Sequence, residues 1–222
     1  MVHHSKPYTP PAHTELDMIY QDDDLLVVNK PAWLLSVPGR GEDKQDCMLS
    51  RVRLEYPEAL VVHRLDMATS GLMLLARNKE MQSKLGTLFE KRQIDKRYIA
   101  MVDGKLEHQT GEINQPLITD WPNRPKQKID HVNGKPSLTS YKVLNYNEEQ
   151  NTSRVELIPK TGRTHQLRVH LQSIGHAIIG DRLYASTEAQ KKSERLLLHA
   201  VKLSFIHPVT QQELVLNSNA PF

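Results

Sequence analysis

The carboxylate best placed for chemistry is Asp66, in the polar run HRLDMATSG at residues 63–71. Short apolar segments precede and follow this run, so we expect Asp66 in a turn between two buried strands. A carboxylate in such a turn is either the partner of a buried arginine or a reactive group. The pattern by itself favours the structural partner and leaves the reactive role open.

Other common site signatures are missing from the sequence. Residues 39–44 lack both the spacing of a phosphate-binding glycine loop and the Ser or Thr after its lysine, and there is no Gly-x-Ser-x-Gly elbow. The eleven histidines are scattered, and His165 and His170 are poorly spaced to share a helix face. We therefore expect no metal site.

Positive charge gathers at two places, although 29 Lys and Arg against 26 Asp and Glu leave a net charge of only +3. Residues 120–128, DWPNRPKQK, are predicted to form an ordered surface loop whose Arg124, Lys126 and Lys128 are either phosphate contacts or solvated charges. The second cluster comprises Lys91, Arg92, Lys96, Arg97 and Lys105. If the two clusters converge in space, they form an RNA footprint.

Short strands and a few helices must position these residues. The strands are predicted at 25–28, 60–63, 71–76, 98–102, 138–146, 153–159, 196–205 and 213–216. One amphipathic helix is predicted to begin after Asn78 as N-cap and to end near Lys91, and a second to begin after Thr164 and end at Gly175. This pattern predicts an α+β fold with a mixed, largely antiparallel sheet and a few flanking helices.

Composition limits the class of protein. The 222 residues permit one or two domains, and a single cysteine, Cys47, excludes an internal disulfide framework. The proline-rich residues 1–15 are predicted to be a flexible arm and 16–222 the folded domain. No signal-peptide core and no stretch of about 20 apolar residues is present, so we expect a cytoplasmic protein with no membrane contact. Nothing in the sequence demands a partner subunit, so we expect a monomer.

Several motifs together resemble the RluA family of pseudouridine synthases. Besides residues 63–71, these are Asn29-Lys30-Pro31 with the loop to Gly39, the start of the 98–102 strand with Lys96 and Tyr98, residues 162–171 (GRTHQLRVHL), Gly180-Asp181 and residues 197–200 (LLHA). They occur in the order that the family uses and span most of the chain.

The resemblance implies an RNA-modifying isomerase that needs no cofactor. Within the family, the 35–40 loop, the 120–128 segment and the absence of a separate N-terminal RNA-binding domain are similar to the short members. Those members act on a uridine in a tRNA anticodon stem-loop and on one in a 23S rRNA stem-loop. A family member specific for only one of these RNAs is the alternative.

The resemblance also implies roles for individual residues. Asp66 corresponds to the catalytic aspartate, Arg168 to the arginine that pairs with it, and Tyr98 to a tyrosine that stacks on the uracil or exchanges a proton at C5. Arg64 is expected to fill the space that a flipped uridine leaves, and Leu198 to pack under the base. Lys96 and the cations of the 120–128 segment are expected to bind RNA.

The chemistry leaves alternatives open. Isomerisation breaks the N1–C1′ bond and forms a C5–C1′ bond, and Asp66 can stabilise the positive sugar, attack C1′ or remove the 2′ proton. A pure RNA-binding module would explain the basic clusters but has no use for a buried Asp66 and Arg168. A nucleoside hydrolase would use the same carboxylate and release free uracil.

Overall fold

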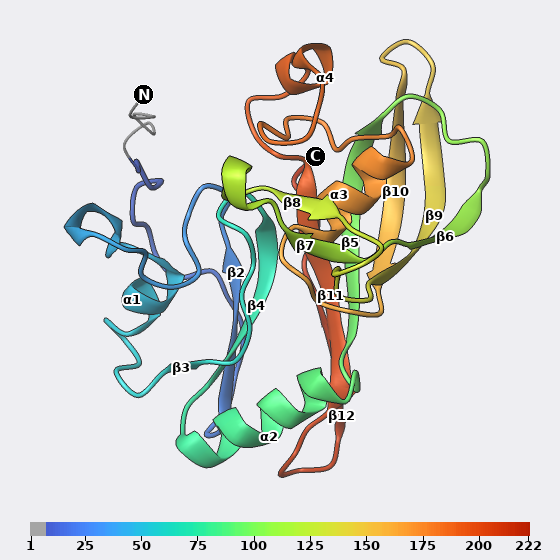
Figure 1. Cartoon of the computed structure of the whole chain (residues 1–222). Helices are drawn as coiled ribbons and strands as arrows, with labels where there is room; N and C mark the ends of the chain where they lie inside the picture. Colours follow the sequence, from blue (N-terminus) through green and yellow to red (C-terminus); the bar gives the residue numbers. More distant parts are fainter. Residues whose placement is uncertain (1–7) are drawn as a thin grey trace.

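The computed structural model describes residues 8–222 and contains twelve strands and four short or medium α-helices in that part of the chain (Figure 1). The strands are β1 (Met18–Gln21), β2 (Leu25–Lys30), β3 (Leu60–Val61), β4 (Ser70–Ala76), β5 (Asp95–Asp103), β6 (Thr110–Asn114), β7 (Leu117–Thr119), β8 (Gln127–Ile129), β9 (Leu138–Asn147), β10 (Thr152–Pro159), β11 (Leu198–Ile206) and β12 (Glu213–Asn217). The helices are α1 (Met48–Val52), α2 (Lys79–Glu90), α3 (Gln166–Ser173) and α4 (Thr187–Lys191), with 3₁₀ turns η1 (Glu42–Lys44) and η2 (Trp121–Asn123).

Ten of these strands form one sheet, in the order β1-β2-β4-β11-β5-β10-β9-β6, with β3 paired to β4 and β12 to β11. The strands pair antiparallel except for β4 and β11, which run parallel at the middle of the sheet. The predicted mixed, largely antiparallel α+β class is therefore confirmed. Because β11 lies between β4 and β5, it joins the N-terminal part of the sheet to the part built from later residues.

The apolar run of β2 is continuous because both of its faces are buried. Leu25 and Val27 pack with Met81 and Leu85 of α2, whereas the alternate residues Leu26 and Val28 pack with the cluster that contains α1. On the other side of β11, α3 covers β5 and β10 through Leu167 and Leu171. Figure 1 shows α3 lying near the junction of these two parts. The pocket described below lies beside it.

Of the two predicted helix N-caps, one is confirmed and one is wrong. The Asn78 side chain caps α2 by accepting a hydrogen bond from Met81 N at 2.8 Å, as predicted. The prediction of Thr164 as the cap of α3 is wrong: the N-cap is His165, in the left-handed region at φ 54°, and its side chain makes no capping bond. The Gln166 side chain instead accepts from Arg163 N, which turns the chain into the helix.

All eight predicted segments contain strands, but β1, β6, β7 and β8 were not predicted. The predicted loop at 120–128 is in fact the tip of the β7–β8 hairpin, with η2 inside it and β8 beginning at Gln127. This hairpin was not predicted because its strands are only three residues long and prolines lie between them, so the sequence shows no alternation of apolar and polar residues.

The first described residues of the predicted arm contact the folded domain. Residues 1–7 of the predicted arm lie outside the described residues, whereas Tyr8 donates to the Asp46 carbonyl and Arg51 to the carbonyls of Pro11 and Ala12. No helix within residues 8–222 is long and apolar enough to cross a membrane.

Candidate active site

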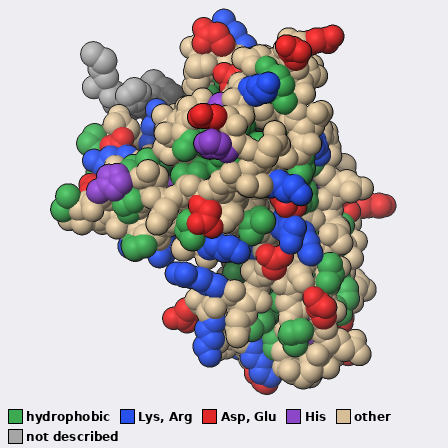
Figure 2. All heavy atoms as spheres, turned by 90° about the vertical axis from the view of Figure 1, so that its right-hand side faces the viewer, with side chains coloured by type: hydrophobic (Ala, Val, Ile, Leu, Met, Phe, Trp, Pro, Cys, Tyr) green, Lys and Arg blue, Asp and Glu red, His purple; other side chains and the backbone are tan. Residues whose placement is uncertain are grey.

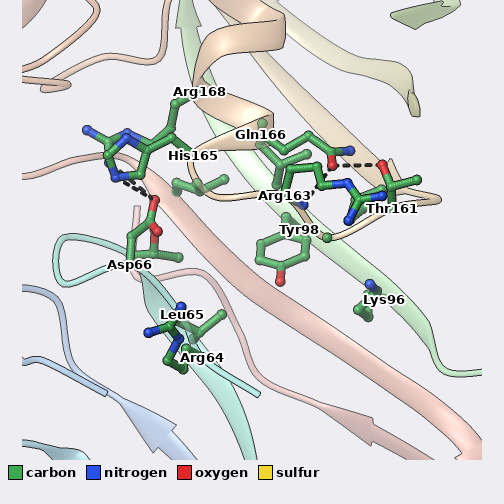
Figure 3. Close-up of a pocket in the computed structure, with 15 residues that line it drawn as sticks. Arg64, Leu65, Asp66, Lys96, Tyr98, Thr161, Arg163, His165, Gln166 and Arg168 are labelled. Atoms are coloured by element: carbon green, nitrogen blue, oxygen red, sulfur yellow. Dashed lines mark hydrogen bonds and ion pairs between the residues drawn. The ribbon is translucent and has the colours of Figure 1, made fainter. Parts of the chain in front are cut away.

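A pocket lies where the turn before β4 meets β5, β11 and the start of α3. Its lining includes the predicted site residues Arg64, Asp66, Lys96, Tyr98, Arg168 and Leu198. The other lining residues are Leu65, Thr69, Pro159, Thr161, Gly162, Arg163, His165, Gln166 and Leu167. Figure 3 shows these side chains converging from separate elements. The fold thus assembles residues that are far apart in sequence, such as Asp66 and Arg168, which are 102 positions apart.

Asp66 occupies the predicted turn between apolar segments, and its carbonyl accepts a hydrogen bond from Thr69 N at 3.1 Å. One carboxylate oxygen, Oδ2, lies 3.2 Å from Arg168 Nη1 and 3.9 Å from His165 Nε2 (Figure 3). Among the described residues, Oδ1 has no hydrogen-bond donor. Since the side chain is only partly buried, at 26% exposed, Oδ1 is the oxygen available to a ligand in the pocket.

Arg168 is buried and contacts two carboxylates. Its Nε and Nη2 each donate at 2.8 Å to Asp181, a bidentate pair, while Nη1 donates to Asp66. Burial opposes the charged form, but the hydrogen bonds and charge of Asp181, aided by Asp66, raise the pKa of Arg168 above its ordinary value. The predicted pairing with Asp66 is present, but the stronger partner is Asp181, which the sequence reasoning did not assign.

Tyr98 lies in β5, opposite Ala200 of β11 and Leu157 of β10, and its ring lines the pocket. Burial, with a further contribution from the charge of Asp66, raises the pKa of the phenol above its ordinary value. The side chain is thus a neutral phenol at neutral pH. Buried Leu198, on β11, forms an adjacent part of the pocket wall.

Cations surround one edge of the pocket. Arg64 is exposed, and Arg163 and the partly buried Lys96 also line the pocket. Burial, with the charge of Arg92, lowers the pKa of Lys96, whose ammonium also lies 5.9 Å from the Phe89 ring centroid. A neighbouring groove shares Arg64, Lys96 and Arg163 and adds Arg92 and Lys160. Of the second predicted cluster, Lys96 therefore lines the pocket itself and Arg92 the neighbouring groove.

Arg124, Lys126 and Lys128 do not line the pocket. Arg124 lies over the exposed Trp121 ring at 4.7 Å, at the tip of the β7–β8 hairpin. A direct link to the pocket comes instead from Gln127, whose backbone N–H donates to the Tyr184 hydroxyl at 2.7 Å. Tyr184 in turn contacts His165 of the pocket lining.

Lys30, which lies in the Asn29-Lys30-Pro31 motif but had no predicted role, is a buried cation. Its ammonium donates to the carbonyls of Pro31, Leu34 and Met67, at 2.8, 2.7 and 3.2 Å. Burial lowers its pKa to about 7, and the charge of Asp66 opposes that shift. Because Met67 follows Asp66, Lys30 anchors the turn that carries the carboxylate. The sequence signal that could have identified this anchor was a lysine at the end of a predicted buried strand.

Charge elsewhere is mixed. Figure 2 views the molecule from the side on which β6 and β9 lie. On this face Lys and Arg are interspersed with Asp and Glu, in keeping with the net charge of +3. Among the described residues, Asp22, Asp24 and His207 lie close enough to share an ion. However, His207 Nδ1 accepts from the backbone of Val209 and Thr210, so its hydrogen resides on Nε2, which faces Asp22 as a donor rather than a ligand.

Comparisons with known proteins agree on one kind of enzyme. A family model described as RNA pseudouridylate synthase matches residues 24–173. The chain is 52% identical over 204 residues to the dual-specificity RNA pseudouridine synthase RluA of Vibrio parahaemolyticus, covering 90% of this chain and 82% of that one. It is 48% identical over 215 residues to the protein of the same name from Escherichia coli K12, covering 97% and 98%. The solved structure of human RNA pseudouridylate synthase domain containing 1 matches with a TM-score of 0.80 and 29% identity, covering 96% and 87%.

Proposed function

We propose roles for the pocket residues from the premise that this chain belongs to the RluA family of RNA pseudouridine synthases. It is an isomerase that converts uridine in RNA to pseudouridine. The reaction breaks the N1–C1′ bond, turns the uracil and joins C5 to C1′; C5 then loses its hydrogen and N1 gains one. No electrons enter or leave, and each step requires only groups that hold, stabilise or move protons.

Asp66 is the catalytic carboxylate in this proposal. The observation that carries it is the free Oδ1 at the pocket while Oδ2 is held by Arg168. A carboxylate with one oxygen anchored and the other open is suited to meet C1′ or the 2′ proton of a bound ribose, and to stabilise positive charge on the sugar. The anchored oxygen keeps the side chain in one orientation, which lowers the entropy cost of reaching the reactive geometry.

Tyr98 and Leu198 hold the base. The partly buried Tyr98 ring can stack on uracil, and its neutral phenol can take up the C5 proton only while it hands its own hydroxyl proton to a base such as Asp66. Arg168 acts through Asp66 and is therefore a positioning residue. Leu198 supplies apolar contact against the face of the ring.

Arg64 and Lys96 contact the RNA around the flipped nucleotide. A uridine in a stem or loop must leave its stack before its glycosidic bond can be reached, at a cost of a few kcal/mol. The exposed, planar Arg64 guanidinium at the pocket edge can stack where the base was and contact phosphates. Arg124, Lys126 and Lys128 bind the backbone of the same RNA from the β7–β8 hairpin.

The substrates in this proposal are a tRNA anticodon stem-loop and a 23S rRNA stem-loop. The two relatives named above are called dual-specificity enzymes, and the chain covers most of their length. A member acting on only one of the two RNAs is the second candidate. We also infer that the enzyme acts as a monomer in the cytoplasm and needs no cofactor or metal.

The test uses stem-loop transcripts of both kinds carrying tritium at C5 of uridine. The wild-type enzyme is expected to release tritium and leave pseudouridine in the RNA, whereas Asp66→Asn binds both RNAs but releases none. Asp103→Asn, which removes a carboxylate at an exposed ion pair, is the matched control and should stay active. Full activity of Asp66→Asn would overturn the assignment of the carboxylate, and release of free uracil would indicate a hydrolase.

A further inference from the structure

A chain of contacts runs from the β7–β8 hairpin to Asp66. The backbone N–H of Gln127 donates to the Tyr184 hydroxyl at 2.7 Å, the hydroxyl lies 2.7 Å from His165 Nδ1, and His165 Nε2 lies 3.9 Å from Asp66 Oδ2. Gln127 follows directly after Lys126 and precedes Lys128. The hairpin that carries the outer cations is thereby joined to the reactive carboxylate through two side chains.

The directions of the hydrogens follow from the partners. Burial raises the pKa of Tyr184 to about 12, so its phenol keeps its hydrogen at neutral pH. Gln127 N–H occupies the phenol oxygen as a donor, and among the described residues the only acceptor near the phenol hydrogen is His165 Nδ1. Burial lowers the pKa of His165 despite the charge of Asp66, so the ring is neutral. Its single hydrogen therefore resides on Nε2, which faces Asp66.

Tyr184 is itself held firmly. Its backbone N–H donates to Asp181 Oδ1 at 3.3 Å, and the Arg168 guanidinium lies 5.1 Å from its ring centroid. His165 has a left-handed backbone at φ 54°, a conformation that is unfavourable for a residue with a Cβ and therefore needs support from its surroundings. Both residues thus have little freedom to turn away from the pocket.

We propose that Tyr184 and His165 form a relay that couples RNA binding by the β7–β8 hairpin to the orientation of Asp66, with Tyr184 selecting the His165 tautomer whose Nε2–H faces the carboxylate. This rests on the assignment of Asp66 as the catalytic carboxylate. The 3.9 Å separation is too long for a hydrogen bond in the free protein. When RNA draws the hairpin onto the pocket, the contact shortens, as catalytic hydrogen bonds do in substrate complexes. His165 and Tyr184 are positioning residues in this scheme.

The tautomer is directly measurable by long-range ¹H–¹⁵N NMR of the imidazole. In the wild-type protein, His165 is expected to show a protonated Nε2 and an unprotonated Nδ1. Tyr184→Phe keeps the ring but removes the hydroxyl, and should give a mixture of the two tautomers. A protonated Nδ1 in the wild type, or an unchanged tautomer in Tyr184→Phe, would overturn the relay.

Kinetics tests the coupling. Tyr184→Phe is expected to lower the single-turnover rate constant at saturating enzyme about tenfold, the effect of losing one hydrogen bond of about 1.4 kcal/mol, with RNA affinity unchanged. His165→Asn should lower it by at least as much, since Asn tolerates the left-handed backbone while lacking the imidazole. Tyr146→Phe deletes a phenol that bonds only Asn151 on an exposed turn and serves as the matched control. Unchanged rates in both pocket variants would refute the proposal.

A double-mutant cycle separates coupling from simple loss of a contact. Lys126→Ala is expected to lower the saturated rate constant in the wild-type background but not in Tyr184→Phe, where the relay is already broken. Additive effects would show that the hairpin does not act through Tyr184. The failure of the proposed function is distinguishable, because it would appear as an active Asp66→Asn or an inactive wild-type enzyme, whatever the relay variants do.

Discussion

Arg168 donates two hydrogen bonds to Asp181 and one to Asp66, so a single buried cation is shared between a fully buried carboxylate and one that opens onto the pocket. The bidentate bond to Asp181 fixes the plane of the guanidinium. Only the remaining Nη1 is left for Asp66, at the longer distance of 3.2 Å. The geometry lets Arg168 orient Asp66 through Nη1 while two of its five N–H donors hold the guanidinium against Asp181.

Asp181→Asn is expected to destabilise the protein by about 3–5 kcal/mol, because it removes one partner of a buried ion pair. The freed guanidinium should also turn toward Asp66 and slow catalysis in the remaining folded enzyme. Urea unfolding and tritium release measure the two effects. The control Asp103→Asn breaks an exposed pair and should cost at most about 1 kcal/mol. Equal stability losses in the two variants would contradict the bridging role.

Lys30→Met is expected to lower the free energy of unfolding by about 3 kcal/mol. The variant keeps the length of the side chain but leaves the carbonyls of Pro31, Leu34 and Met67 without their common donor. Because Met67 adjoins Asp66, activity should fall even under conditions in which the variant is folded. The exposed Lys79→Met should change stability by less than about 0.5 kcal/mol. A fully active and stable Lys30→Met would refute the anchoring role.

Gly71→Ala is expected to destabilise the fold strongly, by more than about 3 kcal/mol. Gly71 pairs with Ala200 of β11 and has a φ of 115°, and an added Cβ would clash with the Ala200 backbone. Gly86, within α2, has open space around its Cβ position, so Gly86→Ala should stabilise the protein by about 1 kcal/mol. Thermal unfolding of both variants checks the opposite signs.

Because the pKa of His63 is lowered in the folded protein, we expect the protein to lose stability in mild acid. Burial, with the charge of Lys96, lowers its pKa from 6.5 to about 3, and its Nε2 accepts a hydrogen bond from Leu74 N. Between these values the unfolded chain binds a proton that the folded protein does not, so stability falls as pH drops from 6.5 toward 3, by up to about 1.4 kcal/mol per pH unit. His63→Gln retains an acceptor but does not titrate. Denaturation at about pH 7 and about pH 5 should show a smaller change in the variant, and identical changes would exclude His63 as the cause.

Arg64→Ala is expected to reduce modification of stem-loop RNA by about tenfold or more while leaving stability within about 0.5 kcal/mol, since the side chain is exposed. Arg64→Lys should not restore the rate, because an ammonium lacks the planar surface that stacks on bases. Single-turnover rates and urea midpoints separate the two effects. Full rescue by lysine would indicate a simple charge contact with phosphate.

The local sequence determined much of the framework. The continuous apolar run at 25–28 predicted a buried strand, Asn78 predicted the cap of α2, and the polar run at 63–71 placed Asp66 in a turn between strands. These features depend on neighbours within a few residues, which is the range over which alternation, capping and turn preferences act. The resemblance to a family then supplied the proposed roles of Asp66, Tyr98 and Arg168.

Only the tertiary structure decided which distant groups share the pocket. The parallel pairing of β4 with β11, and the position of α3 beside them, bring residue 66 to residue 168 and residue 165 to residue 184. The bond of Arg168 to Asp181, the three carbonyls around Lys30 and the link from Gln127 through Tyr184 follow from that packing. No local pattern encodes them, because each depends on strand order and on burial that excludes water from all partners at once.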